Sequence, residues 1–201
     1  MNWWRILLSL IGGYLLGSVS VAIVLTRRKG GDVRDKGSGN AGATNVARVY
    51  GIWVGLATLV GDGVKTALAM LLVGRLLAGE PGMAAAAFGC LLGHCFPLYF
   101  GFKGGKAVSV GAAIGICLDW RLFLIILGVF LVLAFSTKRV SVGSMAAAAA
   151  FPVGMLILGG FPWYSLALGC FITVFVIFMH RGNLQRLLKG TEPEFKLGKP
   201  K

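Results

Sequence analysis

Three polar stretches of this chain contain the residue types that bind phosphate. The first reads "GSGNAGATNVAR", in which glycines let backbone N–H groups approach an anion and polar side chains can hydrogen-bond to it. Arg48, at its end, can contact a phosphate with two N–H groups at once. A plain linker would need neither this arginine nor the Asn and Thr residues. We therefore expect this stretch to bind a phosphorylated ligand through Gly39, Asn40, Thr44 and Asn45, together with Ser38 and Arg48.

The second stretch, "GFKGGKAVS", places two lysines around a pair of glycines, just before a short apolar segment. It is not a Walker motif, because Phe100 and Ala107 stand where that motif has Gly and Ser or Thr. A helix that begins near Ala107 would still present free N–H groups and a partial positive charge to a phosphate. We expect the fold to accept a methyl group at either glycine. The sequence therefore predicts a phosphate-binding loop that contains Lys103, Gly104, Gly105, Lys106 and Ser109.

The third stretch, "HRGNLQRLLKGTEPEF", begins at His180, and Asn183 follows one helical turn later. The two side chains share a helix face only if the helix continues past Gly182. His180 can be an ordinary histidine at the membrane interface or a functional residue of the same site, and the residues alone leave both interpretations open.

Two charged residues, Asp62 and Lys65, lie three positions apart within an apolar segment. Charges inside a membrane are costly and usually face a polar interior. The two can form a structural ion pair, or they can line the substrate site, and we keep both interpretations while counting them among the candidate substrate-binding residues. His94, in another apolar segment, can likewise either hydrogen-bond within the helical bundle or take part in chemistry.

The elements that must hold these stretches are membrane-spanning helices. Hydrophobic residues make up 57% of the chain and charged residues 13%, and the mean hydropathy is +0.82, whereas soluble domains are about half apolar and about a quarter charged. We predict a single all-α polytopic membrane domain over residues 1–201. The polar stretch after the first span has almost nothing with which to build a hydrophobic core. The seven predicted transmembrane helices are 4–27, 49–76, 82–102, 106–118, 121–137, 140–159 and 161–180.

Basic residues orient these spans. All but four of the 20 Lys and Arg residues fall on one side of the predicted membrane, and the exceptions are Arg5, Arg75, Arg121 and the intramembrane Lys65. By the positive-inside rule, the N-terminus lies outside and the C-terminus in the cytoplasm, which requires an odd number of spans. All three polar stretches then face the cytoplasm. The net charge of +13 reflects this bias, with some attraction to anionic lipids of the bilayer, and we expect no nucleic-acid partner.

Tryptophan and cysteine positions agree with a membrane protein. The five Trp residues, at positions 3, 4, 53, 120 and 163, fall at predicted span ends, as an interfacial belt should. The four Cys residues, at positions 90, 95, 117 and 170, are scattered through apolar spans, which favours packing in the core. We expect no metal ion and no cofactor.

Three segments together carry a family resemblance. "GSGNAGATNVAR", "HCFPLYFGFKGGKAV" and "HRGNLQRLLKGTE" resemble the signature regions of the bacterial acyl-phosphate:glycerol-3-phosphate acyltransferases, the PlsY type. The resemblance implies a seven-helix protein of the inner membrane that transfers a fatty acyl chain from acyl phosphate to the 1-position of sn-glycerol 3-phosphate. The products are lysophosphatidic acid and phosphate, in the first step of phospholipid synthesis. It also implies a functional link to the enzyme that produces acyl phosphate.

The same resemblance implies roles for individual residues. Ser38 and Arg48 match essential polar residues of the first region, and Gly104, Gly105 and Lys106 match a glycine-rich phosphate loop. In the third region, His180 and Asn183 match functional residues, and Glu192 matches a structural one. The resemblance therefore implies five catalytic residues: Ser38, Arg48, Lys106, His180 and Asn183. The base that takes the substrate's hydroxyl proton is either His180 or a phosphate oxygen of a substrate.

The residues themselves fit such a donor. Acyltransferases that use soluble thioester donors carry His-x4-Asp, but no Asp follows His94 or His180 at that spacing. Acyl phosphate already has a good leaving group, so that no covalent enzyme intermediate is required. The competing interpretation is a transporter of a phosphorylated or other anionic solute, which would also need basic, glycine-rich loops. A transporter would more often show internal repeats, and the chain has none that we detect.

Overall fold

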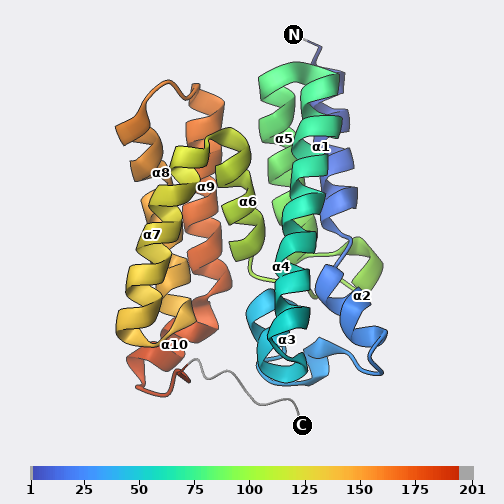
Figure 1. The fold of residues 1–201 in the computed structure, drawn as a ribbon. Coiled ribbons are helices and arrows are strands. Elements are labelled where there is room, and N and C mark those ends of the chain that lie inside the picture. The colour runs from blue at the N-terminus through green and yellow to red at the C-terminus, as the bar shows by residue number, and fades with distance from the viewer. Residues whose placement is uncertain (1, 195–201) are drawn as a thin grey trace. The chain divides into compact units, whose positions relative to one another are not determined.

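Every regular element in the part of the chain that the computed structural model describes, residues 2–194, is a helix, so that the predicted all-α class is confirmed (Figure 1). The helices form two compact units, and the boundary between Ile114 and Gly115 falls inside α6 (Val108–Leu118). The expectation of a single domain over 1–201 stays a prediction. The first two polar stretches belong to the first unit, and the described part of the third belongs to the second.

The first unit is built on a close helix pair, α1 (Trp3–Gly17) and α5 (Leu76–Cys95). Gly13 and Gly17 of α1 lie against the backbone of α5, and Gly89 and Gly93 of α5 lie against the backbone of α1, so that a Cβ at any of the four would overlap the other helix. Small residues at this four-residue spacing let membrane helices pack closely. The chain then breaks at Ser18–Ser20 before α2 (Val21–Arg27), and the predicted span 4–27 is therefore two helices.

After α3 the chain forms a long hairpin: α4 (Ile52–Ala67) and the π-helical segment η2 (Leu68–Arg75) are its first arm, and α5 is its second. The hairpin reverses at Ala78 and Gly79, where the φ angle of Gly79 is +63°. Gly74 and Gly82 then face each other across it, with no room for a side chain at either position. Its two arms correspond to the predicted spans 49–76 and 82–102.

The boundaries of these two predicted spans need correction. Val49 and Tyr50 belong to a separate helix, α3 (Ala43–Tyr50), because Gly51 has a φ angle of +93° and breaks the chain before α4. The last arm ends at Cys95, since the residue before Pro97 is forced out of the helical region. A 3₁₀ turn, η3 (Leu98–Phe100), follows instead of further α-helix.

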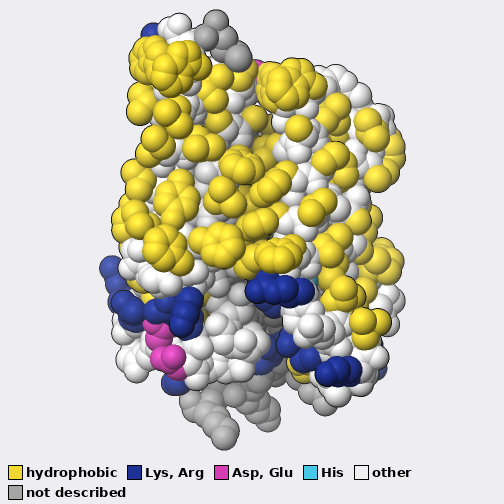
Figure 2. Space-filling view, turned by 180° about the vertical axis from the view of Figure 1, so that it is seen from behind, with side chains coloured by type: hydrophobic (Ala, Val, Ile, Leu, Met, Phe, Trp, Pro, Cys, Tyr) yellow, Lys and Arg dark blue, Asp and Glu magenta, His cyan; other side chains and the backbone are white. Residues whose placement is uncertain are grey.

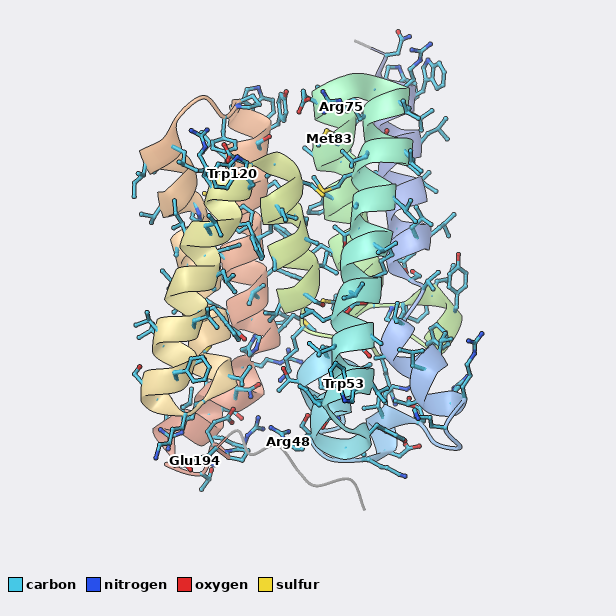
Figure 3. All side chains as sticks on the ribbon, in the orientation of Figure 1. Arg48, Trp53, Arg75, Met83, Trp120 and Glu194 are labelled. Atoms are coloured by element: carbon cyan, nitrogen blue, oxygen red, sulfur yellow. The ribbon has the colours of Figure 1, made fainter. Side chains whose placement is uncertain are left out.

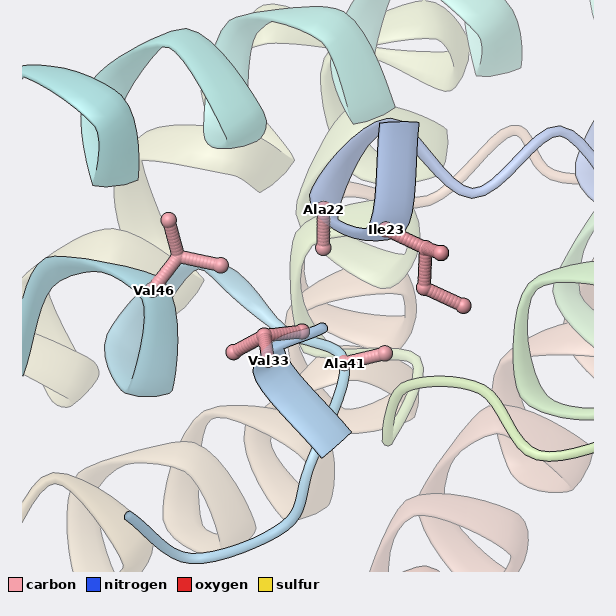
Figure 4. Close-up of a cluster of buried hydrophobic side chains, with 5 residues drawn as sticks. All are labelled: Ala22, Ile23, Val33, Ala41 and Val46. Carbon is pink, nitrogen blue, oxygen red and sulfur yellow. The ribbon is translucent and has the colours of Figure 1, made fainter. Parts of the chain in front are cut away.

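The first polar stretch has a hydrophobic core of its own, contrary to the sequence expectation. A 3₁₀ turn, η1 (Val33–Asp35), and α3 fold against α2. Five side chains meet there: Ala22, Ile23, Val33, Ala41 and Val46 (Figure 4). All five are fully or almost fully buried, and Tyr50, Val54 and Phe100 pack around them. The short apolar residues were too sparse in sequence to predict this cluster, which needs α2 as its second side.

The second unit is an antiparallel arrangement whose helices lie close to the predicted spans. After α6 come α7 (Trp120–Thr137), α8 (Val140–Leu158), α9 (Trp163–Met179) and α10 (Arg181–Leu188). Asp119 caps α7 by accepting the N–H of Arg121, and Lys138 in the left-handed region ends it. Cys170 is exposed on α9, which corrects its expected core position, whereas Cys90 and Cys95 in the first unit are buried as expected.

The helices carry the surface of a membrane protein. Among residues 2–194, four helical segments are long and apolar enough to cross a membrane, including the 49-residue hairpin Ile52–Phe100, and a fifth arises if α9 and α10 form one bent span. Large hydrophobic side chains cover the helices, and Lys and Arg gather toward one end (Figure 2). Within the first unit, Arg48 and Trp53 lie at one end and Arg75 and Met83 at the other (Figure 3). The count of seven spans and the orientation stay predictions.

Candidate active site

Asn45 shapes the first polar loop. Its side-chain oxygen accepts the N–H of Ser38 at 2.9 Å, and its amide nitrogen lies within 3.0–3.2 Å of the carbonyl oxygens of Val33, Lys36 and Asn40. Asn45 is buried, whereas Ser38 is exposed between two glycines with positive φ angles. The loop is therefore wrapped around one buried amide, which holds Ser38 at the surface.

The other predicted residues of this loop lie around Ser38 or on α3. Gly39 is exposed, and Asn40 is half-buried. Thr44 and Arg48 are one helical turn apart on α3, so that their side chains share a face. Within residues 2–194 the half-buried guanidinium of Arg48 makes no ion pair or side-chain hydrogen bond. Its planar set of donors remains available to a ligand.

Arg34 joins the first two polar stretches, a role that the sequence analysis missed. It makes a two-point contact with Asp32, with nitrogen–oxygen distances of 3.0 and 2.8 Å, and donates to the carbonyl of Phe100 at 2.7 Å. The hydrogen bond from Arg34 outweighs partial burial and lowers the pKa of Asp32 to about 2. The only local signal was an acid and an arginine two residues apart, which does not predict a contact with Phe100.

The glycine pair of the second stretch lies directly against His94. The N–H of Gly104 donates to the carbonyl of Cys95 at 3.1 Å, and the N–H of Gly105 donates to the carbonyl of His94 at 3.0 Å. A Cβ at Gly104 would overlap that carbonyl of His94, and a Cβ at Gly105 would overlap the imidazole ring. Two expectations are thereby corrected: these N–H groups are used within the protein, and a methyl group at either position does not fit without a shift. Lys106 and Lys103 follow and precede this pair, and Lys103 is exposed.

A buried polar cluster lies beneath this loop. The ammonium of Lys65 is 2.9 Å from the Oδ1 atom of Asp62 and 3.1 Å from the Nδ1 atom of His94. It also donates to the carbonyls of Gly17 and Val19, at 3.2 and 3.0 Å, where the chain breaks between α1 and α2. Lys65 therefore has a structural function at that break.

The cluster defines the protonation pattern of His94. Because an ammonium group only donates, the Nδ1 atom of His94 accepts from Lys65, and a neutral ring then carries its proton on Nε2. The 3.6 Å between His94 and Asp62 is too long for a hydrogen bond. The other carboxylate oxygen of Asp62 accepts the hydroxyl of Ser109 at 2.8 Å. Ser109, predicted to bind substrate, is thus tied to the buried acid.

In the second unit, His180 sits at a 57° bend between α9 and α10. Its Nδ1 atom is 2.8 Å from the carbonyl oxygen of Val176. Because a carbonyl oxygen can only accept a hydrogen bond, Nδ1 must be the donor, and a neutral imidazole then has its single N–H at Nδ1. The basic nitrogen is then Nε2. Helix α10 begins at Arg181 and runs through Gly182, with Asn183 in its first turn and His180 at the bend before it, so that a shared helix face of His180 and Asn183 stays a prediction.

Glu192 holds the region around Asn183 together. One carboxylate oxygen accepts from Ser141 at 2.6 Å and from the amide of Asn183 at 2.7 Å, and the other accepts from Arg186 at 2.8 Å. Burial alone would raise the pKa of Glu192, but these three hydrogen bonds hold it below its usual value of 4.5. The contacts agree with the structural role that the resemblance implied, and Ser141 had no signal in the sequence.

The structure therefore brings the predicted residues together in two sets. The first unit holds the loop around Asn45 and the glycine pair above the buried cluster. The contact of Arg34 with the carbonyl of Phe100 links these two parts. The second unit holds His180 and Asn183 with Glu192. The meeting of the two sets in one site stays a prediction.

Comparisons with known proteins agree with one another. A family model described as "Glycerol-3-phosphate acyltransferase" matches residues 7–190. A protein of that name from Syntrophotalea carbinolica is 41% identical over 189 residues, covering 93% of this chain and 96% of the relative. One from Brucella anthropi is 40% identical over 185 residues, covering 92% and 90%.

Solved structures are similar over nearly the whole chain. The crystal structure of PlsY (YgiH), an integral membrane glycerol 3-phosphate acyltransferase, in its glycerol 3-phosphate form has a TM-score of 0.89 at 32% identity, covering 95% of this chain and 96% of that one. Its lysophosphatidic acid form has a TM-score of 0.87 at 31% identity and covers 96% of each chain.

Proposed function

The chain belongs to the glycerol-3-phosphate acyltransferase family, and from this premise we propose that it moves a fatty acyl chain from acyl phosphate to the 1-position of sn-glycerol 3-phosphate. The products are lysophosphatidic acid and phosphate. One observation supports this most directly: the similar crystal structure is described in a glycerol 3-phosphate form and in a lysophosphatidic acid form, which are the acceptor and the product of such a transfer. This favours an enzyme over an anion transporter.

The chemistry needs no group beyond the two substrates and the side chains named above. The 1-hydroxyl oxygen of glycerol 3-phosphate attacks the carbonyl carbon of acyl phosphate, and a new ester bond forms. The bond between that carbon and the bridging oxygen breaks, and phosphate leaves with the electron pair. The hydroxyl proton passes to the Nε2 atom of His180 or to a phosphate oxygen. The Nδ1 contact of His180 with Val176 supports the first alternative, because it leaves Nε2 as the basic nitrogen.

The cationic side chains have the roles that two phosphorylated substrates require. Arg48 binds a phosphate through its guanidinium, and Lys106 stabilises the charge that develops on the leaving phosphate. Ser38 is held at the surface of its loop by Asn45, in a position to hydrogen-bond with a substrate. Asn183 takes part in catalysis beside His180, and its bond to Glu192 fixes its position. Binding is completed by Gly39, Asn40, Thr44 and Lys103.

The same proposal covers the setting of the reaction. Seven spans, an outer N-terminus and a cytoplasmic C-terminus place the polar stretches on the cytoplasmic side of the inner membrane. Support comes from the gathering of Lys and Arg at one end of the helices. A soluble enzyme that produces acyl phosphate would then supply the donor from that side.

The test uses purified full-length protein in detergent with glycerol 3-phosphate and either palmitoyl phosphate or palmitoyl-CoA. We expect lysophosphatidic acid and inorganic phosphate in equal amounts from the first donor, and little product from the second. Comparable kcat/KM with palmitoyl-CoA and none with palmitoyl phosphate would show that the donor is wrong. No lysophosphatidic acid from either donor would show that the activity is wrong.

A further inference from the structure

We propose that the buried cluster of Asp62, Lys65, His94 and Ser109 positions Lys106 for the acyl transfer. The four residues are positioning residues, because they act through the backbone that carries Lys106. The inference rests on the proposed function for what Lys106 does, and on the hydrogen bonds of the first unit for how it is held.

Residues on both sides of Lys106 in the sequence contact this cluster. On one side, Gly105 donates its N–H to the carbonyl of His94 and lies against the ring. On the other side, Ser109, in the first turn of α6, donates its hydroxyl to Asp62. The chain between them passes through Ala107, which is fully buried and held at a φ angle of +65°. A non-glycine residue adopts that conformation only when its surroundings impose it.

The two contacts depend on each other through Lys65. Its ammonium touches the carboxylate of Asp62 and the Nδ1 atom of His94, at 2.9 and 3.1 Å, so that the ring and the carboxylate are held by one cation. Asp62, Lys65 and His94 are 1%, 6% and 4% exposed. Removing one member of a buried ion pair leaves the other uncompensated, so that none of the three can move alone at low cost.

This arrangement explains why both glycines precede the lysine. Gly104 passes the backbone carbonyl of His94 and Gly105 passes the imidazole, each so closely that a side chain is excluded. A rigid platform under a catalytic cation is valuable because a misplacement of about 1 Å in an active site can lower the rate on the order of a hundredfold. Asp62 and Lys65 lie on α4, and His94 lies near the end of α5, so that helical residues and not loop residues support the lysine.

The test compares three variants of the full-length enzyme with a control. His94→Leu removes the acceptor for Lys65, His94→Asn keeps an oxygen close to the position of Nδ1, and Ser109→Ala removes one bond to Asp62. Ser9→Ala is the control, because Ser9 is also buried in the first unit but its hydroxyl bonds to Arg5 of its own helix. The measurements are hydrogen–deuterium exchange of the peptide spanning residues 101–107, thermal stability, kcat, KM and the pH dependence of kcat.

We expect exchange at Gly104 and Gly105 to be at least about tenfold faster in His94→Leu and Ser109→Ala, with a matching fall in kcat/KM and an unchanged shape of the pH profile. His94→Asn should recover part of both losses. Equal loss in His94→Asn and His94→Leu together with a changed pH profile would make His94 a proton-transfer group and overturn the proposal. Lower thermal stability with unchanged kinetics and unchanged local exchange would also overturn it, because the cluster would then only stabilise the fold.

The exchange measurement needs no substrate. If the wild-type protein forms no lysophosphatidic acid, the proposed function fails, while the local exchange still decides whether the cluster orders the loop.

Discussion

The N–H of Gly105 donates to the carbonyl of His94 at 3.0 Å, and the imidazole of the same histidine fills the space that a side chain at position 105 would need. The glycine is therefore required by its neighbour beneath the loop, and not only by a ligand above it.

Gly104→Ala and Gly105→Ala should both lower stability as well as activity. At Gly104 the added methyl group meets backbone atoms of His94, and at Gly105 it meets a ring that Lys65 holds in place. Overpacking of this kind costs about 1–3 kcal/mol. Thermal denaturation in detergent measures it, with Gly63→Ala as the control, because a Cβ there meets no other atom within 4 Å. Normal stability of both loop variants with a raised KM alone would restore the interpretation as a simple phosphate cradle.

Asn45→Asp should disorder the first polar loop. The carboxylate has almost the shape of the amide but presents only acceptors to the three carbonyls that the amide nitrogen now contacts. We expect a loss of stability of roughly 2–3 kcal/mol, since buried polar groups are left unsatisfied. Limited proteolysis between residues 34 and 42 should become faster than in the wild-type protein. Unchanged cleavage would mean that the loop is ordered by its hydrophobic cluster alone.

Arg48→Lys should lower kcat/KM by at least about a hundredfold while leaving stability unchanged. A lysine ammonium cannot reproduce the two parallel hydrogen bonds of a guanidinium to phosphate. The fold should not respond, because the guanidinium makes no ion pair with the part of the chain that the structure describes. Arg28→Lys, an exposed arginine on the same unit, is the control. Wild-type KM and kcat for Arg48→Lys would remove Arg48 from the site.

Glu192 should make the protein sensitive to acid. Its pKa lies below the usual 4.5 in the folded protein, so that its stabilising contribution is complete above pH 4.5 and is lost as the pH falls through the lowered value. Glu192→Gln should cost about 2–3 kcal/mol at neutral pH, because hydrogen bonds to a charged group are lost. The difference in melting temperature between wild type and variant should shrink below pH 4.5. A constant difference down to the lowest pH at which the protein folds would contradict this.

Cysteine accessibility should report the orientation. In a background with Cys117→Ser and Cys170→Ser, which keeps only the buried Cys90 and Cys95, a cysteine introduced at Ser38 or Lys189 should react only with reagents that cross the inner membrane. A cysteine at Glu80, in the reversal of the hairpin, should react with an impermeant reagent from outside. The opposite pattern would invert the topology.

The helical class and most helix positions followed from the sequence, because hydropathy is a local property and a membrane demands about 20 apolar residues per helix. The polar stretches were equally visible, since residues that cannot pack against lipid stand out in an apolar chain. Even so, the predicted spans 4–27, 49–76 and 82–102 had inaccurate ends. Their breaks at Ser18–Ser20, Gly51 and Pro97 depend on single residues within otherwise apolar runs.

Only the tertiary structure decided what the polar residues contact. Asn45 was expected to bind a substrate; its side chain bonds to backbone groups up to 12 residues away, and its substrate contact stays a prediction. The Gly104–Gly105 pair was expected to offer its N–H groups to phosphate, and it donates them to the end of α5. Lys65 reaches His94 across 29 residues and Gly17 across 48. Residue types and spacing along one helix indicate which groups are polar, but the partner of each group depends on which helices pack together, and that is set by packing across the whole unit.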